Sequence, residues 1–280
     1  MSHKKVVFSP VASELRLSFD KVNTSWQTLG VMGLSLLLLA TSGFLISVAG
    51  YYWLVLLLNS VALYMLYIVM HDASHNAVFK SVRANELLGH FCILFFNPGF
   101  AFKTFRFIHM RHHRYTNEAG KDPDLWADSR FIWLLPFKWL TTDVGYVLFF
   151  FRNREEFKTS EQKRQIIHFA LLILLICGLT MAGYGMELLF YWVIPFRIAL
   201  FFLTLFLDYL PHIPYQHVQS EAPFKATNVI EKKGWLDRVL FFLMLGQNYH
   251  LVHHLFPQIP FHQSRNVWKR IKYRVKALNR

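Results

Sequence analysis

The chain has 280 residues, of which 54% are hydrophobic, and it carries a formal net charge of +13 at pH 7. Its two cysteines, Cys92 and Cys177, stand apart in apolar stretches, which argues against a disulfide framework or a thiolate metal site. The basic residues flank apolar segments and form no nucleic-acid-binding motif, so nucleic acid is not an expected partner. The first apolar run follows a polar stretch, so a removable signal peptide is not expected.

Four apolar runs dominate the chain. They cover residues 29–50, 51–70, 166–182 and 188–207, and each is close to the ~20 residues that cross a bilayer core as a helix. The connections within each pair are very short, around Gly50 and around Gly183. Buried helices of a soluble protein are the alternative, but four such lengths argue against it. The sequence therefore predicts an all-α integral membrane protein with two transmembrane hairpins, forming a single domain over residues 1–280.

The placement of Lys and Arg predicts the orientation. Four precede the first run, fourteen lie in residues 71–165, eleven follow residue 207, and the tight turns carry none. Loops rich in Lys and Arg stay on the cytoplasmic side of a membrane. Both termini and the middle segment are then expected in the cytoplasm, at the inner or plasma membrane if the source is bacterial.

Shorter segments are harder to assign. Residues 87–102 are apolar but broken by Asn97-Pro98-Gly99, which indicates a re-entrant or interfacial piece. Residues 131–151 are rich in aromatic residues and contain Pro136, Lys138 and Asp143. They are expected to lie in the membrane interface, with a fifth span as the alternative. The basic tail, residues 263–280, has the pattern of an amphipathic helix, for contact with solvent and anionic lipid or for docking an acidic electron donor.

One charge falls inside an apolar run. Arg197 lies in the fourth predicted span, where an unpaired charge costs several kcal/mol. It is expected either to contact a polar substrate head or to pair within the helical bundle.

Three short boxes hold eight of the fourteen histidines. They read HDASH from residue 71, HMRHH from residue 109 and HLVHH from residue 250, and the orientation above places all three on the cytoplasmic side. Residues at i, i+3 and i+4 share one helix face, so each box would aim two or three imidazoles in one direction. Neutral imidazole is the commonest protein ligand of transition metals, and eight such ligands suit two ions. The cytoplasmic part is therefore predicted to be a histidine-rich helical cap.

The type of metal follows from the ligand set. Zinc rarely takes more than four ligands, and a zinc protease motif HExxH is missing. Redox metals with open coordination positions activate dioxygen. A site at the membrane surface would place that oxidant beside a lipid-like molecule, so oxidation of an unactivated C–H bond is the predicted chemistry.

The stretches VMHDASHNA, HHRYTNEAGKDPD, LDYLPHIP and GQNYHLVHHLFPQIPF, together with the two hairpins, resemble the membrane fatty acid desaturase and hydroxylase superfamily. In detail they are similar to cyanobacterial-type β-carotene hydroxylases and the acyl desaturases grouped with them. The resemblance runs from the second apolar run to Phe261.

This resemblance implies a non-haem centre of two iron ions and a reaction that consumes O2. It implies a ninth ligand as well, for which His212 fits better than His217. Asp208 stands where related desaturases often have Asn, so it is expected to orient a ligand or to bind through water. Asp72 is expected to accept a hydrogen bond from an imidazole or to lie on the helix surface. The implied iron ligands are His71, His75, His109, His112, His113, His212, His250, His253 and His254.

The predicted activity is that of an acyl-lipid desaturase, with a carotenoid ring hydroxylase as the alternative. The boxes do not separate the two reactions, since both begin with hydrogen abstraction. No HPGG haem-binding motif occurs, so a separate electron donor, ferredoxin or a small cytochrome, is expected. A metal-binding transporter is the reading from another class, but transporters place their ligands near the bilayer midplane, whereas these boxes lie at the ends of apolar runs.

Overall fold

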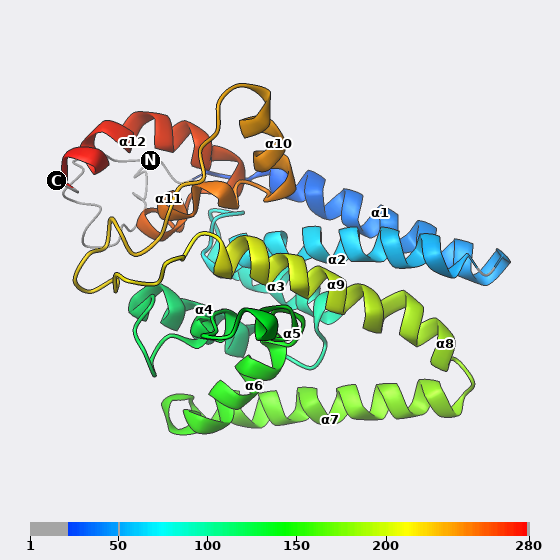
Figure 1. Ribbon diagram of the computed structural model, residues 1–280. Helices are drawn as coiled ribbons and strands as arrows, with labels where there is room; N and C mark the ends of the chain where they lie inside the picture. The colour runs from blue at the N-terminus through cyan, green and yellow to red at the C-terminus, as the bar shows by residue number, and fades with distance from the viewer. Residues whose placement is uncertain (1–21, 50, 279–280) are drawn as a thin grey trace.

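Four long apolar helical segments form the body of the molecule (Figure 1). The structure is a computed structural model that describes residues 22–49 and 51–278, and within them it contains helices and loops but no β-strand. The segments are α1 (Trp26–Ala49), α2 (Tyr52–Ser74), α7 (Thr159–Met181) and the stretch Gly185–Tyr209, and each is long and apolar enough to cross a membrane. The four spans predicted at 29–50, 51–70, 166–182 and 188–207 are confirmed at this level.

The fourth segment is not a uniform α-helix. It consists of α8 (Gly185–Leu188), a π-helical turn over Leu189–Val193, α9 (Ile194–Leu203) and a second π-helical turn over Thr204–Tyr209. A π-turn admits one extra residue per turn and is frequent at functional sites. The second of these turns ends just before His212.

Burial differs sharply among the four segments. In the most apolar window of α2, 61% of residues are buried inside the protein, against 17% for α1 and 6% for α7. Apolar side chains such as Phe44 on α1 and Leu174 on α7 are more than half exposed. A helix that exposes large apolar side chains along its length fits a lipid environment, whereas α2 forms the centre of the bundle.

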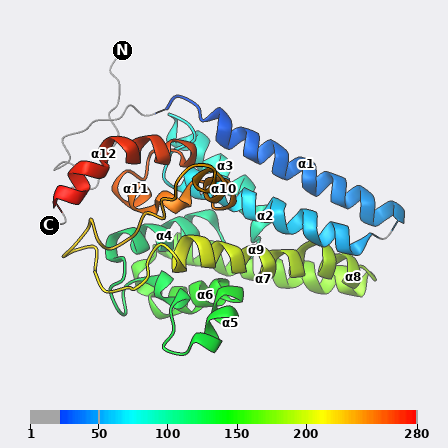
Figure 2. The ribbon, with the colours of Figure 1, turned by 45° about the horizontal axis from the view of Figure 1, so that its top comes forward.

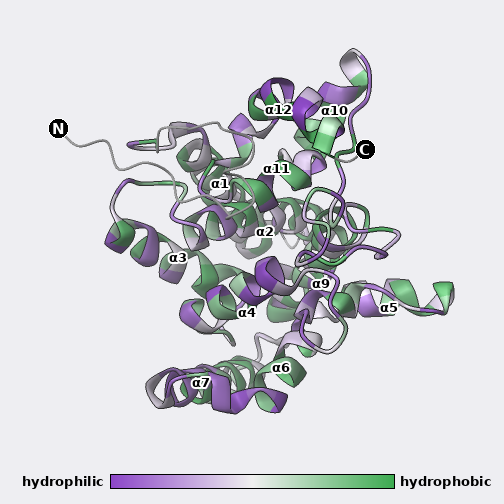
Figure 3. Cartoon of the chain, turned by 90° about the vertical axis from the view of Figure 1, so that its left-hand side faces the viewer, coloured by the Kyte–Doolittle hydropathy of each residue, from purple (hydrophilic) through white to green (hydrophobic). Residues whose placement is uncertain are grey.

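The shorter helices gather at one end of the bundle (Figures 1 and 2). Figure 3 looks onto this end and shows hydrophilic residues on α4, at the start of α7 and on α12. The predicted basic tail forms α12, and Arg280 lies outside the described residues, as does the basic N-terminal stretch used for the orientation. These helices are α3 (Val82–Phe96), α4 (Phe102–Tyr115), α5 (Leu135–Leu140), α6 (Thr142–Arg152), α10 (Trp235–Leu243), α11 (His250–Leu255) and α12 (Ser264–Leu278).

The helices α3 and α4 form a tight antiparallel pair. The chain reverses at Asn97–Phe100, where the sequence predicted a break, and Gly89 lies directly against the ring of Phe102. A Cβ atom at Gly89 would come within 2.1 Å of that ring, so only glycine permits this approach. The pair brings α4, which carries the second histidine box, back toward the end of α2.

The aromatic stretch 131–151, predicted to lie in the interface or to form a fifth span, consists of two helical parts with a sharp bend between them. Its two parts, Ile132–Leu140 and Thr142–Arg152, meet at an angle of 78°. The second part, α6, packs against the π-turn before His212 through a 2.7 Å hydrogen bond between the hydroxyls of Thr142 and Thr204.

Candidate metal centre

Each histidine box occupies a helix that ends in the same region. His71 and His75 close α2, and the three histidines of the second box lie in the last two turns of α4. The third box forms α11. His212 follows the second π-turn, and its ring is buried, whereas His217 is exposed. The structure thus brings together the eight box histidines and His212, and leaves His217 outside.

The nine imidazoles form two adjoining groups. Within each group, one nitrogen of every ring lies within 4.8 Å of the others. We call the groups the five-histidine cluster (His71, His75, His109, His113 and His253) and the four-histidine cluster (His112, His212, His250 and His254). His113 lies beside both, since its ring stacks on that of His254 at 4.2 Å between centroids.

Distances between ring nitrogens within the clusters are short. The Nε2 atoms of His75 and His109 are 2.8 Å apart, and those of His113 and His253 are 2.9 Å apart. In the four-histidine cluster, the Nε2 atom of His254 lies 3.0 Å from that of His250 and 3.3 Å from that of His112. Metal–nitrogen bonds of about 2.1 Å place neighbouring ligand atoms about 3 Å apart, so these spacings fit nitrogens directed at a common ion.

Several buried imidazole nitrogens have no hydrogen-bond partner. Among the described residues, both ring nitrogens of His71 and of His212, and Nδ1 of His109, are buried and unpaired. A buried polar atom without a partner is unfavourable. A transition metal would use these lone pairs, so the residues present fit the binding of two metal ions, one in each cluster.

Burial also sets the protonation of the clusters. Desolvation, followed by the proximity of other histidines, lowers the pKa of His75, His109, His113, His250, His253 and His254 well below 6.5. Desolvation and the charge of His112 lower the pKa of His212 in the same way. These rings are neutral at pH 7, which is the form that binds metal.

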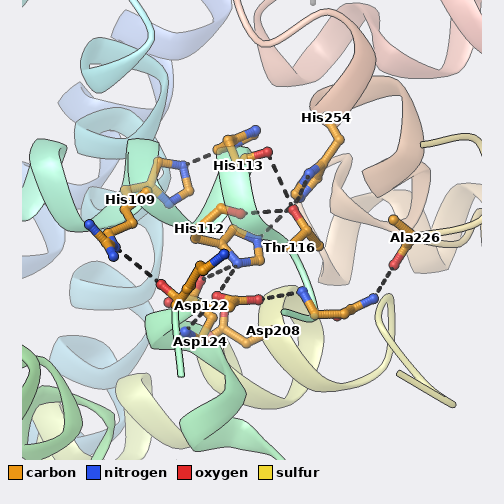
Figure 4. Close-up of polar contacts among 12 residues, drawn as sticks. His109, His112, His113, Thr116, Asp122, Asp124, Asp208, Ala226 and His254 are labelled. Carbon is orange, nitrogen blue, oxygen red and sulfur yellow. Dashed lines mark hydrogen bonds and ion pairs between the residues drawn. The ribbon is translucent and has the colours of Figure 1, made fainter. Parts of the chain in front are cut away.

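His112 differs because it faces carboxylates. Its Nδ1 lies 2.9 Å from Oδ1 of Asp122 and 3.3 Å from Oδ2 of Asp124 (Figure 4). Burial alone would lower the pKa of His112, but Asp124 and Asp122 raise it to about 9. A carboxylate on the outer nitrogen fixes the tautomer and orientation of a metal-binding histidine, so Asp122 aims Nε2 of His112 toward His254.

The two carboxylates are themselves held in place. Asp122 accepts hydrogen bonds from the backbone N–H groups of Asn117, at 2.7 Å, and Asp124, at 2.9 Å. Asp124 accepts a 2.8 Å hydrogen bond from the hydroxyl of Tyr146 on α6. The sequence prediction missed both aspartates. The signal was present in the Asp122-Pro123-Asp124 segment, whose first residue follows His112 by ten residues and caps a 3-10 turn.

The sequence prediction also missed two residues that contact the Nδ1 atoms of histidines in the four-histidine cluster. The ring nitrogen Nδ1 of His254 lies 3.3 Å from Oγ1 of Thr116, which also donates to the backbone oxygen of His112 at 2.8 Å. Nδ1 of His250 lies 3.0 Å from Oε1 of Gln247. Thr116 and Gln247 therefore orient two rings of the four-histidine cluster.

Asp72 and Asp208, the two aspartates that the sequence predicted near the site, have contacts that differ from those of Asp122 and Asp124. Oδ1 of Asp72 lies 3.9 Å from His71, beyond hydrogen-bond range, while Oδ2 accepts from Thr28 at 3.1 Å and from the backbone N–H of Phe261 at 3.3 Å. Asp72 thus ties the first box to the segment that follows the third. Asp208 lines a cavity, and its backbone oxygen accepts a hydrogen bond from the hydroxyl of Tyr215.

The cavity beside the clusters measures about 40 Å³ and has mostly apolar walls. Tyr67 and Phe105 line it, and their rings stack on those of His71 and His109, with centroids 6.1 Å and 5.8 Å apart. The cavity therefore adjoins the five-histidine cluster. Its other lining residues are Met70, Ile93, Phe96, Asn97, Phe100, Thr142, Asp143, Tyr146, Leu200, Leu203, Thr204 and Asp208.

Arg197 pairs within the helical bundle. Its guanidinium donates to both carboxylate oxygens of Asp143, at 2.6 Å and 2.8 Å, and to the backbone oxygen of Leu140 at 2.9 Å. Of the two sequence expectations, pairing within the bundle holds, and it uses three of the five N–H donors of the guanidinium.

Comparison with known proteins agrees with this picture. A dihydrorhizobitoxine desaturase from Bradyrhizobium elkanii is 28% identical over 69% of this chain and 60% of its own length. An sn-1 oleoyl-lipid 12-desaturase from Arthrospira platensis is 25% identical over 92% of the chain and 82% of its own length. A beta-carotene ketolase from Haematococcus lacustris is 25% identical over 71% of the chain and 56% of its own length.

The first and third of these relatives are longer proteins, so the chain spans only 60% and 56% of their lengths. The match to the family itself is more extensive, since it covers residues 21–278 and includes all three histidine boxes and His212. The chain therefore belongs to the fatty acid desaturase family.

Proposed function

We propose that the protein is an O2-dependent, non-haem di-iron oxidoreductase of the membrane that introduces a double bond into a fatty acyl chain of a lipid. The observation that carries this proposal is the convergence of nine buried imidazoles into two adjoining clusters, with an apolar cavity against one of them. The two iron ions, when bound, would supply the activation of dioxygen and the oxidation of a C–H bond.

The remaining steps belong to the chain's own residues. The five-histidine and four-histidine clusters would each hold one ion, with His212 as the ninth ligand. Asp122, Thr116 and Gln247 would orient the imidazoles that they contact. Asp208, at the cavity wall, would orient a ligand or bind through water. The apolar rings of Tyr67 and Phe105 would exclude water from the reacting end of the substrate. Because the cavity is small, at about 40 Å³, a substrate chain must displace side chains to enter it.

We propose further that residues 1–280 form one domain with two transmembrane hairpins, a cytoplasmic histidine-rich cap and both termini in the cytoplasm. The exposed apolar surfaces of α1 and α7 support the membrane placement. The basic residues at the histidine end of the bundle support the orientation, since positively charged loops stay in the cytoplasm. Ferredoxin or a small cytochrome would supply the electrons.

A carotenoid ring oxygenase is the second candidate. The similarity to a beta-carotene ketolase favours it. The resemblance of the histidine-box sequences to those of β-carotene hydroxylases favours it as well. The sn-1 oleoyl-lipid 12-desaturase aligns over more of the chain, which is why the acyl substrate is preferred. The same metal centre would serve both reactions, because each begins with removal of a hydrogen atom from an unactivated carbon.

The test is lipid profiling by mass spectrometry in a desaturase-free host that makes β-carotene and expresses this chain with a ferredoxin and its reductase. New double bonds in fatty acyl chains are expected. Oxygen gained by β-carotene, with unchanged acyl chains, would replace the desaturase by the ring oxygenase. No change in either pool from protein that contains two irons per chain would contradict both.

A further inference from the structure

A basic groove lies on the outside of the bundle, away from the histidine clusters. It encloses about 440 Å³ between α3, the start of α4 and the start of α7. Its lining residues are Arg83, Glu86, Leu87, His90, Lys103 and Arg164. None of these residues belongs to the proposed metal centre, so the groove needs an explanation of its own.

The groove has an excess of positive charge. Its one carboxylate, Glu86, is already shared by Lys103 at 3.6 Å and Arg106 at 3.9 Å. Arg83 and Arg164 are exposed and form no ion pair within the described part of the chain. Lys103 of α4 and Arg164 of α7 line this groove together with His90 of α3. Burial and then the charges of Arg164 and Lys103 lower the pKa of His90, in keeping with this arrangement.

An apolar crevice continues from the same two helices. It encloses about 190 Å³, and its walls include Leu94 and Phe95 of α3, and Leu172 and Leu175 of α7. On the far side it is closed by Tyr191 and Trp192 of the fourth segment. The crevice therefore lies between α3, α7 and the fourth segment.

The groove and the crevice share one face of each helix. On α3, Arg83, Leu87, His90 and Leu94 follow one another at three- and four-residue steps, which keeps them on one side of a helix. On α7, Arg164 and Leu172 are eight residues apart, so they too share a side and are separated by about 12 Å of helix rise. Between them, His168 binds the backbone oxygen of Pro98 at 2.9 Å and fixes α7 to the α3–α4 turn.

We propose that the groove and the crevice together bind an anionic glycerophospholipid. Its phosphate would lie between Arg83, Lys103 and Arg164, and one acyl chain would follow α3 and α7 into the apolar crevice. Charge complementarity selects the anionic head, since two of the cations have no carboxylate of their own. Anionic lipids bind basic residues at the cytoplasmic membrane surface, with a gain for each Lys or Arg.

The apolar half of the site selects a lipid over a free phosphate ion. Leu87 beside the groove is 71% exposed and Ile167 on α7 is 56% exposed, so the cations adjoin a surface that suits hydrocarbon. An inorganic anion would use the cations alone, whereas a phospholipid covers both parts.

This lipid is not the molecule that the clusters would oxidise. The catalytic cavity uses Ile93 and Phe96 of α3, on a different side of the helix from Leu94 and Phe95. An aromatic wall separates the two spaces: the ring of Phe196 lies 5.2 Å from that of Phe96 and 5.5 Å from that of Trp192, between centroids. The bound lipid would therefore support the packing of α3 and α7, and the proposal does not depend on which substrate is oxidised.

The test is native mass spectrometry of the full, lipid-stripped chain in detergent. The chain is titrated with phosphatidylglycerol and with phosphatidylcholine of identical acyl chains. Preferential binding of one phosphatidylglycerol is expected, and the double variant R83Q/R164Q should weaken it about 25-fold, at about fivefold for each cation. The matched control K269Q/R270Q removes two exposed cations from the outer face of α12 and should leave the affinity within about twofold of the unmodified chain.

A second variant tests the apolar half. L175W narrows the crevice without touching a cation, and it should weaken phosphatidylglycerol binding while leaving the metal content unchanged. Equal affinity for the two lipids, equal affinity of R83Q/R164Q and the control, or displacement of the lipid by an equal concentration of inorganic phosphate would each overturn the proposal. Because lipid selectivity is measured on the unmodified chain, the test remains decisive if a variant fails to fold.

Discussion

The two histidine clusters use the same side chain but are held in different ways. In the four-histidine cluster, three of the four rings contact a partner through the outer nitrogen Nδ1. In the five-histidine cluster, Nδ1 of His71 and of His109 is buried without any partner among the described residues. The outer contacts of the four-histidine cluster are His112 to Asp122, His250 to Gln247 and His254 to Thr116.

The difference shows two ways to position a metal ligand. In the five-histidine cluster the rings are positioned mainly by helix packing. Asp72 of α2 accepts hydrogen bonds from Thr28 of α1 and from the backbone of Phe261, which joins α2 to both segments. In the four-histidine cluster, hydrogen bonds fix individual rings, and the carboxylates of Asp122 and Asp124 bring negative charge to one side. We therefore expect the iron affinity of the four-histidine cluster to be sensitive to replacement of the residues that contact its rings.

The largest effect is expected from removing one ligand of each cluster. H253A and H254A are adjacent changes of the same type, and each should lower product formation more than about 100-fold, because loss of even an outer partner costs 10–100-fold in metal affinity. Iron should fall from two ions to one in each variant, measured by plasma mass spectrometry of purified protein. A variant that keeps two irons and full product would contradict the assignment of its ligand.

The next effect concerns the pH dependence of the metal-free protein. The pKa of His112, which burial alone would lower, is raised to about 9 by Asp124 and Asp122, so the folded state binds this proton more tightly than the unfolded chain does. This stabilisation is complete below pH 6.5, the ordinary pKa, and is lost as the pH rises through about 9. The contribution of His112 to the unfolding free energy should therefore fall by about 3 kcal/mol across this window, at about 1.4 kcal/mol per pKa unit. It is measured as a difference from a variant without the carboxylates, because the other buried histidines, whose pKa values are lowered, change the stability of both proteins alike.

The measurement is chemical unfolding of metal-free protein in detergent at several pH values between 6.5 and 9.5, compared with the variant D122N/D124N. Burial and then the charge of Asp122 raise the pKa of Asp124 to about 6 against the opposing effect of His112, so its own titration lies below the window. The unmodified chain should lose stability relative to the variant as the pH rises across this window. Equal slopes for the two proteins would show that another group is responsible.

The sequence was sufficient to predict the features of the site and the fold that depend on local spacing. His109, His112 and His113 share one end of a helix because steps of three and four residues return to the same face. Four apolar runs near bilayer length gave the four long helices. Both predictions rest on short-range geometry, which a single sequence records directly.

The rest depends on how distant segments fold back. His112 meets Asp122 because residues 116–122 reverse direction through Asn117 and Gly120, both with positive φ. His212 is buried after the π-turn over Thr204–Tyr209. The two parts of residues 131–151 pack against the fourth segment, through contacts of α5 with α9 and a hydrogen bond from Thr142 to Thr204. No periodic pattern records these contacts, so Asp122, Asp124, Thr116 and Gln247 were not predicted as part of the site.

A smaller effect is expected from the carboxylate partner alone. D122N keeps the shape of the side chain but removes its charge, so the hydrogen bond that orients His112 at 2.9 Å loses its charged acceptor. Iron affinity of the four-histidine cluster should drop about 10–100-fold, while the five-histidine cluster should keep its ion. The measurement is competition with a chelator, followed by counting the remaining iron. D72N is the matched control in the other cluster, and loss of both ions from D122N at the same chelator concentration would mean that the sites are not independent.

The smallest effect is expected from removing a neutral hydrogen-bond partner of a ligand in place of a charged one. T116V replaces a hydroxyl by a methyl group of similar size and removes the contacts of Oγ1 with His254, at 3.3 Å, and with the backbone oxygen of His112, at 2.8 Å. A neutral hydrogen bond contributes about 1 kcal/mol, so iron affinity of the four-histidine cluster should fall only about fivefold. T116S restores the hydroxyl and should restore the affinity, which a purely steric role of the side chain would not predict. If T116V matched D122N in the chelator assay, the charge of Asp122 would not be what distinguishes the four-histidine cluster, and orientation by any hydrogen-bond partner would be sufficient to explain it.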